Sequence, residues 1–190
     1  YAKHYRTGEP IPSEMITKIE AAAKVNQGYD FGETVEAALL DMKWAALSKE
    51  QAEAINTPAK VTEFERKSLE ELGLEIDLVP PRYRSTYFNH IFSGPAGYSA
   101  GYYSYLWTEM LDRDSRAWFL QNGGLTRENG DHYRDTVLSQ GGTQDYGEMY
   151  RNFAGRDPDV KYMLIALGLA DEEPGTPEQT AEGTSDGRVD

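Results

Sequence analysis

Tyrosines crowd one short segment of the sequence, where Tyr98, Tyr102, Tyr103 and Tyr105 supply four phenols within eight residues. On an ideal helix, at about 100° per residue, Tyr98, Tyr102 and Tyr105 lie on one face together with Glu109. A row of phenol hydroxyls can hydrogen-bond an extended peptide. Packing alone is the commoner reason for an aromatic stripe on a helix. The density of hydroxyls here exceeds what a core usually satisfies, so we predict a peptide-binding wall.

A glycine-rich loop lies directly before and within this segment, with Gly94, Gly97 and Gly101. Because glycine has no Cβ, it lets a second backbone or a ligand approach closely. The stretch from Leu74 to Gly97 is also interrupted by prolines and cannot form one regular element. Long loops inside compact domains are often functional, which marks this region as a candidate site.

Helical periodicity elsewhere predicts an all-α fold, with no competing strand pattern. In one expected helix, Val35, Leu39, Met42 and Ala46 recur at i, i+4, i+7 and i+11, which predicts a deeply packed face. Helices are expected near residues 13–24, 32–48, 61–72, 98–121, 126–139, 144–153 and 158–167. In the tyrosine helix, the flank opposite the phenols should anchor it in the core, through Tyr103, Leu106, Trp107, Met110 and Leu111.

Composition narrows the function classes. The formal net charge of −13 would repel the phosphates of a nucleic acid, so we expect no such partner. No run of about 18 apolar residues predicts a membrane span. The sequence has no cysteine, which rules out disulfides and thiolate zinc sites and suits a cytoplasmic location. The first residue is not Met, so a processed product or a fragment is open, as is secretion. Residues 170–190 read as an acidic disordered tail after a helical part at 1–169.

Two histidines and two arginines are weaker candidates for functional residues. His4 and His132 have no partner at metal-ligand spacing, and we expect them to be structural. Arg82 and Arg84 lie beside the candidate loop and could pair with a substrate carboxylate. Capping of a helix end or loop is the commoner role for such arginines.

Several long motifs, taken in order, resemble one family. The segment FNHIFSGPAGYSAGYYSYLW, residues 88–107, is similar to the His-loop-Tyr segment of the thimet oligopeptidase-like zinc peptidases, especially the bacterial dipeptidyl carboxypeptidases. The resemblance covers roughly residues 1–169. It extends through YAKHYRTGEPIP, LLDMKW, LVPPRYRSTYFNHIF and WFLQNGGLTRENGDHYRDTVLSQGG.

The resemblance implies the C-terminal helical portion of a two-lobed, zincin-type oligopeptidase with a deep channel. In that family a HExxH helix and a later Glu hold zinc, and a water attacks the scissile carbonyl. This chain contains only His4, His90 and His132, none followed by Glu. The resemblance therefore places zinc on residues outside this chain, assigns no metal ligand within it, and predicts that the chain alone is inactive.

Site roles follow from the same resemblance. Tyr105 matches the tyrosine that donates a hydrogen bond to the oxyanion of the tetrahedral intermediate. His90 matches a loop histidine that contacts substrate near the scissile bond, and the other tyrosines of the face match residues that bind substrate or assist the intermediate. The glycines let the loop close over a peptide. The predicted catalytic residues are Tyr105, His90 and Tyr98, and the predicted substrate-binding residues are Tyr102, Gly97 and Gly94.

One departure from the family pattern lies in this loop. The link SGPAG is longer than in the relatives, as if Pro95–Ala96 were inserted. The insertion could displace His90 and bring Ser93 nearer the expected distance from Tyr98.

The function that the resemblance implies is hydrolysis of short peptides, with release of C-terminal dipeptides, by a full-length enzyme that is monomeric. An endopeptidase of the same family is open, because the two differ in how the far end of the cleft is closed. The alternative from another class is a non-catalytic helical module, either peptide-binding or scaffolding, that lacks the zinc half.

Overall fold

The computed structural model describes residues 3–94 and 97–171, and in these ranges the chain is all-α, as predicted. Outside helices, the described residues pair only in the isolated bridges Lys3–Pro10 and Ile76–Val79. The predicted insertion Pro95–Ala96 lies outside the described residues, as does the predicted tail from residue 172 onward.

The chain divides into two compact units, each described by itself. The first runs to Glu109 and takes in Leu167–Leu169, and the second consists mainly of Met110–Ala166. Helix α6 (Ser104–Gln121) begins in the first unit and continues in the second.

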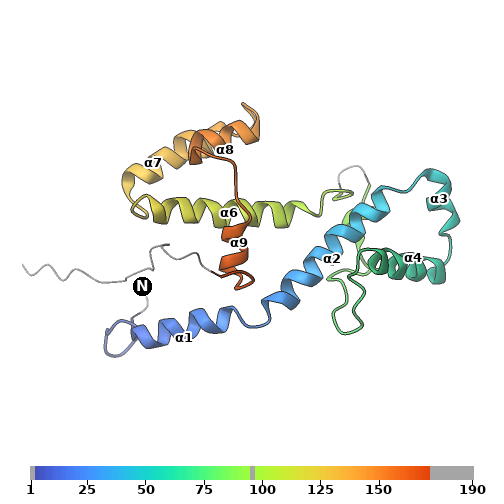
Figure 1. The fold of residues 1–190 in the computed structure, drawn as a ribbon, viewed down its shortest axis with the longest axis horizontal. Coiled ribbons are helices and arrows are strands. Elements are labelled where there is room, and N and C mark those ends of the chain that lie inside the picture. The colour runs from blue at the N-terminus through green and yellow to red at the C-terminus, as the bar shows by residue number, and fades with distance from the viewer. Residues whose placement is uncertain (1–2, 95–96, 172–190) are drawn as a thin grey trace, which may run out of the picture. The chain divides into compact units, whose positions relative to one another are not determined.

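The described residues of the first unit also form helices α1 to α5, of which Figure 1 labels α1 to α4. Side chains at their ends explain several boundaries, because Ser48 and Thr57 each accept a hydrogen bond from a backbone N–H of the first turn. The unpredicted short helix α3 thus begins with a capping box between Ser48 and Gln51. The bounds are α1 Ser13–Ala23, α2 Gln27–Ala45, α3 Lys49–Ala54, α4 Pro58–Glu71 and α5 Asn89–Phe92.

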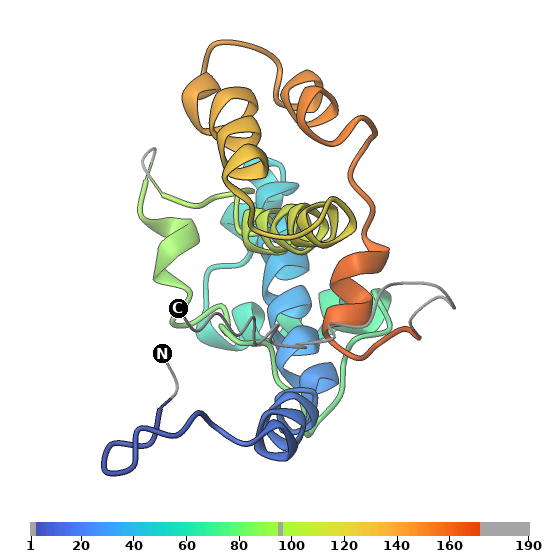
Figure 2. The ribbon, with the colours of Figure 1, turned by 90° about the vertical axis from the view of Figure 1, so that its left-hand side faces the viewer.

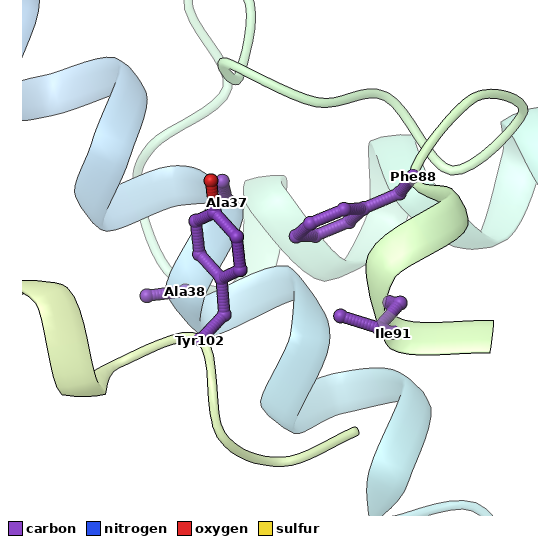
Figure 3. Close-up of a cluster of buried hydrophobic side chains, with 5 residues drawn as sticks. All are labelled: Ala37, Ala38, Phe88, Ile91 and Tyr102. Carbon is purple, nitrogen blue, oxygen red and sulfur yellow. The ribbon is translucent and has the colours of Figure 1, made fainter. Parts of the chain in front are cut away.

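Helix α2 lies at the centre of this unit, and the predicted buried stripe is only partly correct. Of the residues that widen that stripe, Leu40 is fully buried and Trp44 packs on the hydrophobic cluster. Met42, expected in the core, is exposed, whereas Glu36 and Asp41 are fully buried. Ala37 and Ala38 leave room on α2 for rings and chains that come from later segments. Figure 3 shows this hydrophobic cluster, in which Tyr102, Phe88 and Ile91 cover Ala37 and Ala38.

The described residues from Leu74 to Gly94 are irregular except for α5, which agrees with the prediction that Leu74 to Gly97 form no single regular element, and buried polar groups hold this stretch in place. The carboxylate of Glu65, buried on α4, accepts hydrogen bonds from Arg84 Nε at 2.8 Å and from Ser85 N–H at 2.6 Å. The indole of Trp44 donates to Ser85 Oγ at 2.9 Å. These bonds tie the loop to α4 and α2 without regular structure.

Helix α6 begins at Ser104, six residues later than the predicted start at Tyr98. Residues before it form turns, and Ala100 has a φ of 55°, which a helix does not allow. The expected anchoring flank is also only partly correct. Leu106 packs on the buried cluster, but Tyr103 and Trp107 are exposed.

The second unit pairs α7 (Arg127–Thr136) with α8 (Tyr146–Ala154), which lie next to one another in Figures 1 and 2. A short 3-10 helix, Leu138–Gln140, follows α7, and α9 spans Lys161–Ala166. His132 stacks on Trp118 at 5.3 Å, and its Nε2 lies 2.9 Å from the carbonyl oxygen of Phe153. These contacts support the structural role expected for this histidine.

An ion pair between a buried aspartate and a partly exposed arginine joins α6 to the segment after α8. Asp114, fully buried on α6, pairs with both terminal nitrogens of Arg156, at 2.8 and 2.5 Å. It also accepts the backbone N–H of Asp159 at 2.9 Å. The guanidinium of Arg156 and the backbone N–H of Asp159 compensate the burial of this carboxylate.

The buried carboxyl of Glu36 makes the stability of the first unit depend on pH. Burial, with the nearby carboxylate of Glu33, raises the pKa of Glu36 from 4.5 to about 7. The folded state therefore keeps a proton that the unfolded state releases, and stability falls as pH rises from about 4.5 to about 7. We expect Glu36→Gln to leave stability near its native value at about pH 4 and to raise it by up to about 3 kcal/mol at about pH 8. Thermal unfolding at both pH values tests this.

The matched control for this experiment is Glu20→Gln, which changes an exposed glutamate on α1. It should leave the pH dependence unchanged. An identical pH profile for Glu36→Gln and the native protein would show that Glu36 does not hold the proton.

Candidate functional site

The structure brings the predicted histidine and tyrosines together in the first unit. The ring of His90 lies 6.2 Å from that of Tyr98 and 6.0 Å from that of Tyr102, between centroids. The rings of Tyr98 and Tyr105 stack at 6.1 Å, and Tyr102 lies 5.0 Å from Tyr105. We call His90, Tyr98, Tyr102 and Tyr105 the tyrosine–histidine array. The predicted single helical face did not form, because Tyr98 and Tyr102 precede α6 and only Tyr105 is on the helix. Peptide binding by this array stays a prediction.

Tyr83 extends this array, although no sequence pattern predicted it. Its ring lies 4.7 Å from His90 and 5.8 Å from Tyr102, and it stacks on Phe88 at 5.1 Å. It comes from the irregular stretch, where no periodicity relates it to the array. In PPRYRS the flanking arginines were the predicted candidates. A tyrosine between two loop arginines carries no local sequence pattern that indicates a site.

The array has two open phenols and one enclosed phenol. Tyr98 and Tyr105 are 45% and 48% exposed, whereas Tyr102 is 5% exposed. Burial, followed by the interaction with Tyr83, raises the pKa of Tyr102 to about 12. A hydrogen bond with Tyr98 raises the pKa of Tyr105 above its ordinary value. Both Tyr102 and Tyr105 therefore keep their protons at neutral pH and can act as hydrogen-bond donors.

The backbone carbonyl of His90 has a hydrogen-bond partner, whereas one ring nitrogen has none among the described residues. Its backbone carbonyl accepts the N–H of Tyr98 at 2.9 Å, which ties the histidine to the first tyrosine of the array. Its ring Nδ1 is buried and has no hydrogen-bond partner among the described residues. An unpaired buried nitrogen costs about 1–3 kcal/mol, so this site favours a partner from outside the described chain.

Gly97 is required where the loop meets His90. A Cβ at this position would lie 2.7 Å from the carbonyl oxygen of His90, closer than real contacts allow. The N–H of Gly97 donates to the carbonyl of Gly94 at 2.8 Å, and Gly94 has a φ of 85°. Both predicted glycines therefore have a geometric role in joining the loop to the array.

Arg82 and Arg84 are both paired within the chain. Arg82 bonds Glu33 at 2.8 Å, and Arg84 bonds Glu65 at 2.8 Å. Each acid already compensates its arginine, which supports the loop-holding role over binding of a substrate carboxylate.

The described residues contain no cluster of three or more His, Asp or Glu side chains that could hold a metal ion. These residues alone therefore do not fit a zinc site. No helix in the described ranges is long and apolar enough to cross a membrane.

Comparison with known proteins identifies the family. The model of Peptidase family M3 matches residues 1–169, which include the whole tyrosine–histidine array. This chain belongs to peptidase family M3. The resemblance to the thimet oligopeptidase-like peptidases is thereby confirmed.

Over the matched residues, the chain is between 32% and 45% identical to the following members of this family. The chain is 45% identical over 169 residues to dipeptidyl carboxypeptidase of Escherichia coli, covering 89% of this chain and 24% of that protein. It is 34% identical over 169 residues to oligopeptidase A of Salmonella typhimurium, covering 87% of this chain and 23% of that protein. Saccharolysin of Saccharomyces cerevisiae is 32% identical over 174 residues, covering 88% of this chain and 22% of that protein. The chain thus spans about a quarter of the length of these curated M3 relatives.

The close approach at Gly97 predicts a specific stability loss. We expect Gly97→Ala to destabilise the protein by about 1–3 kcal/mol, because the new Cβ meets the rigid carbonyl of His90. Denaturant unfolding measures this. The matched control is Gly32→Ala within α2, where a Cβ meets nothing within 4 Å and should stabilise by about 0.5–1 kcal/mol. Equal effects of the two substitutions would contradict the assigned geometry.

Proposed function

We propose that this chain is part of a longer peptidase that hydrolyses short peptides and releases C-terminal dipeptides. The observation that carries the proposal is the tyrosine–histidine array, which presents two half-exposed phenols beside an unpaired buried imidazole nitrogen. The 45% identity to a protein named dipeptidyl carboxypeptidase supports this choice of reaction. In this proposal the chain supplies one wall of the substrate cleft.

Tyr105 is the proposed oxyanion donor. Its phenol is protonated at neutral pH and exposed, so it can donate a hydrogen bond to the oxygen on which negative charge develops. In this structure it interacts with Tyr98, which stacks against it. We propose that the two phenols exchange this mutual bond for bonds to the intermediate, with Tyr98 assisting.

His90 and Tyr102 have different proposed roles. The unpaired Nδ1 of His90 would gain its missing partner from a bound peptide near the scissile bond. Tyr102 is enclosed, so its proposed contact with substrate is limited to a small part of its side chain. Gly94 and Gly97 would let the loop close on the peptide backbone.

Zinc in this proposal is bound by residues outside this chain, and when bound it would supply an activated water and polarise the scissile carbonyl. The described residues contribute donors and substrate contacts only, so the chain alone should not hydrolyse peptides. We further propose a monomeric, cytoplasmic enzyme whose partners are short peptides and include neither nucleic acid nor a membrane.

Two other functions have specific support. The 34% identity to a protein named oligopeptidase A favours an endopeptidase of the same family. The lack of a metal-binding cluster among the described residues suits a non-catalytic helical module that binds peptides or acts as a scaffold. In-frame coding sequence for HExxH and a later Glu upstream of this chain would separate the enzyme from the module.

Removing one hydroxyl tests the role of Tyr105. We expect Tyr105→Phe in the complete peptidase to lower kcat by roughly 10²-fold, with little change in KM or in bound zinc, because the hydroxyl acts mainly on the intermediate. Steady-state kinetics and metal analysis measure this. The matched control is Tyr103→Phe, which removes a hydroxyl of similar exposure, 50%, that makes no ring contact with the array among the described residues. An unchanged kcat in Tyr105→Phe would refute the role.

The reaction type has its own test. An enzyme that releases C-terminal dipeptides recognises the free carboxylate, so amidation of a peptide's C-terminus should lower kcat/KM by roughly 10²-fold or more. Matched free and amidated peptides measure this in the complete peptidase. Equal rates, with cleavage at internal bonds, would establish the endopeptidase instead.

A further inference from the structure

We infer that Asp41, on helix α2, is the positioning residue of the tyrosine–histidine array. The inference rests on the proposed function, because it assigns Asp41 a part in aligning Tyr105 through the turn that precedes α6. Asp41 lies 59 residues before Ala100 and 61 before Tyr102 in the sequence, and its side chain contacts their backbone N–H groups.

The carboxylate of Asp41 holds two backbone N–H groups of this turn. Its Oδ1 accepts from Ala100 N–H at 2.9 Å, and its Oδ2 accepts from Tyr102 N–H at 3.0 Å. The side chain is fully buried, at 1% exposure. The φ of 55° at Ala100 bends the backbone so that nearby N–H groups can converge on one acceptor, as in an anion-binding nest. Hydrogen bonds to a carboxylate are the strong kind, so the turn is held firmly.

The same stretch of α2 also fixes the side chain of Tyr102. Ala37 and Ala38 lie one turn before Asp41 and therefore share its face of the helix. The ring of Tyr102 packs over these alanines and lies 4.9 Å from the ring of Phe88, as Figure 3 shows for the cluster. Asp41 thus holds the backbone of Tyr102 while the alanines and Phe88 hold its ring.

The ring of Tyr102 contacts both exposed phenols and so helps to position them. Its ring lies 5.0 Å from Tyr105, which is on the first turn of α6, and 6.4 Å from Tyr98. Tyr98 is tied to the same turn, because its carbonyl accepts the N–H of Gly101 at 2.7 Å. A shift of the turn therefore moves both phenols that the proposed function places on the substrate.

Packing alone does not account for a buried carboxylate at position 41. Burying a carboxylate costs several kcal/mol before its hydrogen bonds are counted, and an apolar residue would serve packing alone. A helix start is usually capped by a nearby Ser, Thr, Asp or Asn, and Ser99 and Ser104 are both at hand. The bonds come instead from a distant helix, which sets the register of the turn against α2.

The test uses Asp41→Asn and Tyr105→Phe, alone and combined, in the complete peptidase. The amide can accept only one of the two N–H groups and turns its own NH₂ toward the other, so the turn loosens. We expect kcat to fall roughly 10- to 10²-fold in Asp41→Asn, more than KM rises. In the Tyr105→Phe background the same substitution should cost less than about threefold, because the misaligned hydroxyl is already gone.

The control is Asp114→Asn, another buried carboxylate that accepts a backbone N–H, from Asp159, in the second unit. It should affect kcat equally with and without Tyr105. Full additivity of Asp41→Asn with Tyr105→Phe would overturn the positioning role and leave Asp41 purely structural. If Tyr105→Phe alone leaves kcat unchanged, the proposed function fails, and that result is read independently of Asp41.

Hydrogen exchange of the native protein provides a second measurement that requires no folded variant. Ala100 lies in an exposed turn, yet the N–H groups of Ala100 and Tyr102 should exchange at least 10-fold more slowly than those of the exposed loop at residues 75–78. Exchange as fast as in that loop would overturn the inference, whatever Asp41→Asn does.

Discussion

The site depends on two hydrogen bonds, which the carboxylate of Asp41 accepts from the backbone N–H groups of Ala100 and Tyr102. Without them, the turn before α6 would have no fixed register against α2, and the phenols it carries would have no defined positions. The bonds act together with two small residues, Ala37 and Ala38, which leave space for the ring of Tyr102. One face of one helix therefore holds both the backbone and the ring of this tyrosine.

The site combines rigid support with exposed chemistry. Tyr102 and Phe88 are buried, Gly97 allows the close contact between the loop and His90, and Tyr98 and Tyr105 remain half exposed. A donor held in this way needs little reorganisation when charge develops on a substrate, which is the physical basis of oxyanion stabilisation. The Nδ1 of His90 is buried and has no hydrogen-bond partner among the described residues.

Much of the helical fold could be predicted from the sequence, because helix periodicity is a local signal. The spacing of the tyrosines and the resemblance of residues 88–107 to one family likewise indicated which side chains lie together. The buried face of α2 could be predicted only in part. A hydrophobic stripe through Met42 suggested one face, whereas Glu36 and Asp41 turn inward, and the partners of Asp41 lie far away in the sequence. The start of α6 was missed for the same reason, since the turn at Ala100 is stabilised from α2. Tyr83 comes from a loop whose course is set by Glu65, so no local pattern could place it in the array.

The central claim is that the tyrosine–histidine array contacts the reacting part of a bound peptide. The most direct measurement is a crystal structure of the complete peptidase with a phosphinic peptide, whose tetrahedral phosphinate imitates the intermediate. The account predicts Tyr105 Oη at about 2.5–3.0 Å from a phosphinate oxygen, with His90 in contact with the same peptide. A phosphinate bound out of reach of both side chains would contradict it.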